Sequence, residues 1–163
     1  MPMTICDASR EVERLKLLFH SKAPGPAFEA KMYFPNVFFC DAWDKEMPAP
    51  GISKRSGVYI VLDESEKALY IGKATKNNLA AEIYNRKFKK VTSKDPIRFG
   101  NSELAHSVSD PVVAKMIREG KVKLAAFVIE PAELSSLVEV FLQTMCWQRR
   151  DEGWWPVCNK QIG

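Results

Sequence analysis

The sequence is poor in histidine and lacks the patterns that mark secretion, membrane insertion or zinc binding. It has two histidines and four cysteines, none of them spaced as a CxxC pair. Reduced packing thiols are therefore favoured, and a zinc site is the less favoured alternative. The chain does not open on a basic stretch followed by an apolar run, and no apolar run approaches the length of a membrane span. These absences predict a soluble protein, and we expect it in the cytoplasm.

The chain is long enough for one hydrophobic core. Of its 163 residues, 46% are hydrophobic and 27% are charged, which is neither a fibrous nor a disordered composition. Residues 11–21 have the apolar spacing of an amphipathic helix, and the irregular segment after them is rich in proline and aromatic residues. We therefore expect an N-terminal extension at residues 1–54, which braces the core, and a main domain at residues 55–163.

The main domain begins with an expected β-hairpin. Apolar runs at residues 57–62 and 68–72 flank a polar connection of hairpin length, and residues 122–129 predict a third strand. Residues 93–109 are predicted to form a loop. Three helices are expected around the sheet, at residues 79–90, 110–119 and 131–150. The pattern predicts an α+β fold with a small, mainly antiparallel three-stranded sheet flanked by helices.

Positive charge concentrates between residues 73 and 98. Eight basic and two acidic residues give this stretch a net charge of +6, against +4 for the whole chain. A basic stripe beside a hairpin suits a phosphate backbone, although a solvated lysine face that maintains solubility has the same composition. We assign nucleic-acid contact to Lys73, Lys76, Lys87, Lys89, Lys94 and Arg98.

Each strand of the hairpin contains a glycine and a tyrosine, in GVY at 57–59 and YIG at 70–72. Taken alone, the tyrosines would be assigned to cross-strand packing. Together with LVE at 137–139 and PVCN at 156–159, however, the two triplets resemble the motifs of the GIY-YIG nuclease superfamily. The resemblance covers residues 55–163 and leaves the N-terminal extension unexplained.

The resemblance implies a metal-dependent endonuclease that hydrolyses DNA phosphodiester bonds. Glu139 would hold one Mg²⁺ or Mn²⁺ ion, since one carboxylate plus water and phosphate oxygens is a usual way to bind magnesium. Tyr59 and Tyr70 would orient or deprotonate the attacking water, and Asn159 would hold the site by hydrogen bonds. The expected partner is DNA, double-stranded rather than single-stranded, because no single-strand-binding pattern is present.

The catalytic cation is assigned by spacing. Many members of the superfamily have an arginine soon after the second triplet, where this chain has Glu82. Arg86 fits the longer gap of the restriction-endonuclease branch, and its guanidinium suits phosphate. Lys90 then stands where that branch has histidine. The expected catalytic set, with the motif glycines Gly57 and Gly72, is Tyr59, Tyr70, Arg86, Lys90, Glu139 and Asn159.

Two other functions suit the same sequence. Glu82 and the missing histidine would fit a GIY-YIG domain that has lost catalysis and binds nucleic acid or a protein. A surface formed by Trp147, Trp154, Trp155 and the N-terminal aromatic residues would fit an interaction protein, although such aromatic residues more often lie in a core. Glu139 is about 140° around its helix from the apolar stripe. That angle favours solvent, unless the active face of the sheet lies there.

Overall fold

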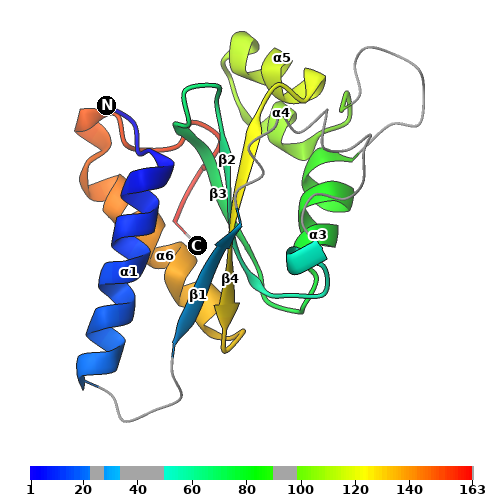
Figure 1. The fold of residues 1–163 in the computed structure, drawn as a ribbon. Coiled ribbons are helices and arrows are strands. Elements are labelled where there is room, and N and C mark those ends of the chain that lie inside the picture. Colours follow the sequence, from blue (N-terminus) through cyan, green and yellow to red (C-terminus); the bar gives the residue numbers. More distant parts are fainter. Residues whose placement is uncertain (23–27, 34–49, 90–98, 163) are drawn as a thin grey trace.

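The computed structural model describes residues 1–22, 28–33, 50–89 and 99–162. Its centre is a four-stranded antiparallel sheet in the order β1-β4-β2-β3. Helices cover both faces of the sheet, with α1 and α6 on one side and α3, α4 and α5 on the other (Figure 1). The expected α+β class, with an antiparallel sheet flanked by helices, is therefore confirmed.

The three expected strands are present, and the sheet has a fourth. β2 (Gly57–Leu62) and β3 (Ala68–Ala74) form the hairpin, and β4 (Lys123–Glu130) pairs with the other edge of β2. The additional strand β1 (Glu29–Tyr33) pairs with β4 along its whole length. Its sequence, EAKMY, contains two charged residues and is mostly exposed, and prolines lie close to it in the sequence. Strand periodicity alone therefore does not indicate it.

The helices agree with the expected ones in order but differ in extent. Outside the sheet, the structure has α1 (Ile5–Lys22), η1 (Pro50–Ile52), α3 (Leu79–Ala81), η2 (Glu82–Phe88), α4 (Glu103–Ser107), α5 (Pro111–Glu119), α6 (Leu134–Gln148) and η3 (Arg150–Glu152). α4 lies in the segment expected to be a loop, and Ser102 caps its first turn by accepting a hydrogen bond from the Ala105 N–H. No helix in the described part of the chain is long and apolar enough to cross a membrane.

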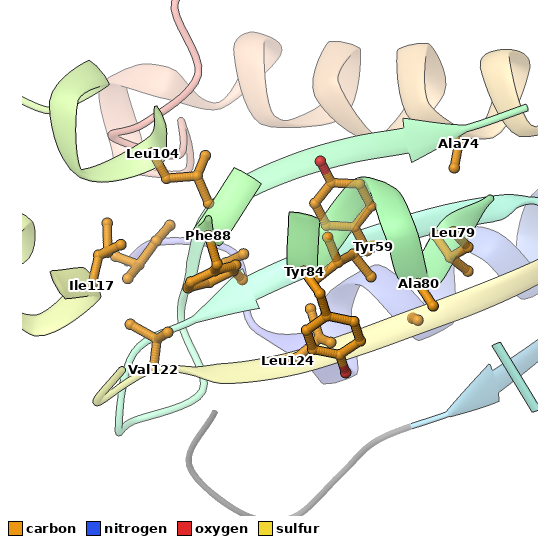
Figure 2. Close-up of a cluster of buried hydrophobic side chains, with 14 of the residues drawn as sticks. Tyr59, Ala74, Leu79, Ala80, Tyr84, Phe88, Leu104, Ile117, Val122 and Leu124 are labelled. Atoms are coloured by element: carbon orange, nitrogen blue, oxygen red, sulfur yellow. The ribbon is translucent and has the colours of Figure 1, made fainter. Parts of the chain in front are cut away.

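Alternation along β2 and β4 divides the apolar side chains between the two faces of the sheet. Val58 and Ile60 point toward α1 and α6, whereas Tyr59 and Val61 point toward η2, α4 and α5. Figure 2 shows the second cluster, in which Tyr59 lies close to η2. Full burial of an aliphatic or aromatic side chain stabilises a fold by about 1.5–3 kcal/mol. The two clusters therefore hold the hairpin firmly between helices.

Candidate active site

Gly72 brings the two tyrosines of the hairpin together. It lies opposite Tyr59 in the strand register, and the rings of Tyr59 and Tyr70 have their centroids 5.8 Å apart. A Cβ atom on Gly72 would lie 2.6 Å from the Tyr70 ring and 2.7 Å from the Tyr59 hydroxyl. Only a residue without a side chain therefore lets both phenols meet over this strand. Gly57 has a related role, because a Cβ there would lie 2.0 Å from the carbonyl oxygen of Phe127 in β4.

The two phenols have different environments. Tyr59 is fully buried, and its hydroxyl has no well-aligned hydrogen-bond partner among the described residues. Burial raises the pKa of Tyr59 well above its usual value, and the nearby Tyr70 and Glu82 raise it further. Tyr59 is therefore a neutral phenol near neutral pH. Tyr70 is half-buried and lines a cleft.

A cleft of about 610 Å³ lies beside β3, one of the two edge strands of the sheet. Its walls come from β3, η2, α4, α6 and the residues after Pro156. Three of the six expected catalytic residues line it, namely Tyr70, Glu139 and Asn159. The fold thus brings together side chains from three segments that are far apart in the sequence.

Glu139 faces the sheet rather than solvent. It is 5% exposed, and its Oε2 lies 2.7 Å from the ammonium nitrogen of Lys73 in β3. One turn later on α6, the Gln143 amide donates a hydrogen bond to the Ile71 carbonyl at 3.2 Å. The apolar stripe of α6 packs under the sheet, so the adjacent flank of the helix is left to face the β3 edge. Of the two orientations that the helical angle left open, the structure has the one toward the sheet.

Asn159 binds the edge of β3 through both ends of its side-chain amide. Its Oδ1 accepts from the Ile71 N–H at 2.9 Å, and its Nδ2 donates to the Ile71 carbonyl at 2.9 Å. The residue before it adds a backbone hydrogen bond, from the Cys158 N–H to the Leu69 carbonyl at 2.9 Å. Trp155 fixes the tail itself, because its indole N–H donates to the Asn159 carbonyl. Asn159 is therefore a positioning residue for the strand that carries Tyr70 and Gly72.

The structure does not bring Arg86 into the cleft, whose described lining includes Lys87 instead. The Arg86 side chain is 65% exposed and forms an ion pair with Glu82 at 3.2 Å. The Lys87 side chain is 11% exposed, and its ammonium nitrogen lies 2.5 Å from Glu103 Oε1. That nitrogen is also 5.3 Å from the centroid of the Tyr70 ring.

The type of helix explains why Lys87, and not Arg86, lines the cleft. An α-helical repeat puts Leu79, Ile83 and Arg86 on one face, but η2 is a π-helix. Its i→i+5 hydrogen bonds add one residue to the turn. Lys87 therefore takes the inward direction expected for Arg86, and it is buried with Leu79 and Ile83. Lys89 then ends the helix in a left-handed conformation with φ of 50°.

The other basic residues that were expected to contact nucleic acid differ in their surroundings. Lys73 pairs with Glu139, whereas Lys76 and Lys89 are exposed. Lys90, Lys94 and Arg98 lie outside the described residues. Sequence reasoning missed His106, which lines the cleft from α4, because the segment was expected to be a loop. The serine cap at residue 102 is the one sequence signal that would have indicated a helix there.

The residues at the cleft fit a divalent ion held by one carboxylate. No group of three His, Cys, Asp or Glu side chains that could hold a metal is present in the described part of the chain. Two carboxylates of the described residues line the cleft: Glu103 is paired with Lys87 at 2.5 Å, and Glu139 is paired with Lys73 at 2.7 Å. Glu139 could hold a hydrated ion through one protein oxygen, with water and a substrate phosphate as the other ligands. The chain matches no protein-family model, no curated protein and no solved structure. Its chemistry is therefore argued from the site itself.

Proposed function

We propose that the chain is a metal-dependent endonuclease that hydrolyses phosphodiester bonds of double-stranded DNA at a GIY-YIG-type site. One observation carries the proposal. Tyr70, Glu139 and Asn159, which the motif resemblance selects from three distant segments, line one cleft together with the ammonium group of Lys87. A phosphodiester is anionic and gains negative charge as it is attacked, so a buried cation and a carboxylate suit its hydrolysis.

Each residue has a role that follows from its surroundings. Glu139 would hold one Mg²⁺ or Mn²⁺ ion, which when bound supplies positive charge next to the scissile phosphate. Lys73 keeps the Glu139 carboxylate in place at 2.7 Å. Tyr70 faces the cleft and orients the attacking water, while the neutral phenol of Tyr59 supports the Tyr70 ring from behind.

Lys87 takes the role of the phosphate-binding cation. Burial by itself lowers the pKa of Lys87, but the hydrogen bond to Glu103 and the nearby Tyr70 raise it overall. Its side chain therefore remains an ammonium ion when DNA enters. An ammonium that is desolvated in a cleft attracts phosphate more strongly than the exposed lysines do, so Lys87 contributes more than Lys76 or Lys89.

The experiment is cleavage of a supercoiled plasmid by the full chain in magnesium, manganese or chelator. We expect nicked and linear products only with a divalent ion. Glu139→Gln should abolish cleavage without weakening DNA binding, because it removes a negative charge beside the phosphate. Glu133→Gln is the matched control, since Glu133 is exposed and directly precedes the same helix. Absence of cleavage by the wild type with either metal would refute the proposal.

A second candidate is a DNA-binding domain without catalysis. It is favoured by the pairing of two of the buried glutamates with cations, Glu139 with Lys73 and Glu82 with Arg86. A carboxylate that is already neutralised has less charge to offer a metal. Salt-dependent DNA binding together with an absence of metal-dependent cleavage would select this candidate.

A further inference from the structure

His106 lines the cleft, and one hydrogen bond fixes which of its ring nitrogens carries the hydrogen. Its Nδ1 lies 2.7 Å from the backbone carbonyl oxygen of Ser102. Since a carbonyl only accepts hydrogen bonds, Nδ1 must carry the hydrogen. In the neutral ring, Nε2 then has the free lone pair. The exposed side chain lines the same cleft as Glu139 and Lys87.

Ser102 joins the position of this ring to that of Lys87. It is fully buried, and its hydroxyl donates to the Lys87 carbonyl at 2.9 Å. The same hydroxyl accepts the Ala105 N–H that begins α4. One buried serine therefore fixes three things: the backbone at Lys87, the start of α4 and the orientation of the His106 ring. Such support is typical of a side chain that must be held in place for chemistry.

The other titratable or charged residues that face the cleft have surroundings that differ from those of His106. They are Tyr70, Lys87, Glu103, Glu139, Cys158 and Lys160. Burial raises the pKa of the Cys158 thiol to about 12, and the ion pair with Lys87 lowers the pKa of Glu103. The Glu139 carboxylate is paired with Lys73. An imidazole that carries its hydrogen on Nδ1, by contrast, has a free lone pair on Nε2 that can accept a proton.

We propose, on the basis of the proposed nuclease function, that His106 is the general base of the reaction and acts through Nε2. Nε2 accepts a proton from the attacking water as the water oxygen bonds to phosphorus. The bond from phosphorus to the departing sugar oxygen breaks, and that oxygen takes a proton from bulk water. The imidazolium is stabilised by its Nδ1–H bond to Ser102, and it returns its proton to solvent after the product leaves.

The test compares His106→Gln with His20→Gln in the full chain. His20 is exposed on α1, which does not line the cleft, and it is the only other histidine. His106→Gln should lower the single-turnover cleavage rate about 100-fold or more, while DNA affinity, which phosphate contacts dominate, should change by less than about twofold. Added imidazole should restore part of the loss.

A second readout does not depend on cleavage. Proton–nitrogen NMR correlation of the histidine rings, assigned with His20→Gln, should show that neutral His106 carries its hydrogen on Nδ1. A hydrogen on Nε2, or cleavage at the wild-type rate in His106→Gln, would overturn the assignment and leave the nuclease function intact. A wild type that cuts no DNA with magnesium or manganese would instead overturn the proposed function, and the role of His106 with it.

Discussion

Lys87 and Arg86 are neighbours in η2 with the same charge, yet their side chains occupy opposite environments. Lys87 lines the cleft and is 11% exposed, whereas Arg86 points outward and is 65% exposed. Replacement of each by glutamine removes one positive charge and retains good helix propensity. The two variants therefore compare the side of η2 that faces the cleft with the side that faces solvent, within a single protein.

The expected losses of activity differ by a large factor. Removal of a preorganised group that stabilises transition-state charge costs about 100-fold to 1,000-fold in rate, and we expect a loss in this range for Lys87→Gln. The dependence of DNA affinity on salt should become shallower by about one phosphate contact. Arg86→Gln should retain cleavage close to the wild-type rate, because its guanidinium does not reach the described lining of the cleft.

The expected loss of stability is larger for Arg86→Gln than for Lys87→Gln. Lys87→Gln leaves Glu103 without its partner, but that carboxylate is 42% exposed, so the cost should stay below about 1 kcal/mol. Arg86→Gln leaves Glu82 unpaired with its side chain 10% exposed. A poorly solvated carboxylate that loses its partner costs roughly 1–3 kcal/mol in the free energy of unfolding.

Single-turnover plasmid cleavage, DNA binding at several salt concentrations and urea unfolding measure the three quantities. The expected outcome is one variant that is stable and inactive and another that is less stable and active. If Arg86→Gln remains folded but loses cleavage as completely as Lys87→Gln, Arg86 is the catalytic cation. The argument from the π-helix would then be wrong.

Three further perturbations test the geometry of the fold. Gly72→Ala should destabilise the protein by about 1–3 kcal/mol, because the new methyl group overlaps both tyrosine rings, and thermal unfolding would measure the loss. Asn159→Ala leaves a backbone N–H of β3 unpaired and should lower the free energy of unfolding by roughly 1–3 kcal/mol in urea titrations; an unchanged midpoint would contradict this. Burial raises the pKa of Cys146 and Cys158 to about 12. The folded protein keeps thiol protons that the unfolded chain releases above about pH 9, so its stability should fall between pH 9 and 12, by roughly 1–3 kcal/mol at pH 10. Constant stability over that range would refute this account.

The hairpin and the strand that pairs with it could be predicted from sequence because their residues alternate or form short apolar runs between turn residues. The helices at α5 and α6 were likewise indicated by a proline start and by an apolar stripe. These local signals indicated the elements but not the site: Tyr70, Glu139 and Asn159, which share the cleft, were selected by the resemblance to the GIY-YIG motifs.

The remaining features depend on geometry that a periodic pattern does not contain. The extra residue per turn in η2 cannot be recognised from an apolar spacing of four, which suits both helix types. It turns Lys87 rather than Arg86 toward the cleft. α4 is five residues long, too short to show a period, so His106 was not selected. The burial of Glu139 depends on β3, which covers the flank of α6 beside its apolar stripe. β3 is distant from α6 in the sequence.

The attachment of Asn159 to Ile71 has a consequence for the behaviour of the protein in solution. An outer strand with free N–H and carbonyl groups invites another chain to add a strand of its own, which leads to aggregation. The side-chain amide of Asn159 occupies both groups of Ile71 and so blocks that addition near the middle of β3. Since Ile71 lies between Tyr70 and Gly72, one side chain guards against self-association and keeps the two phenols aligned. Loss of solubility and loss of activity should therefore occur together in variants of the C-terminal tail.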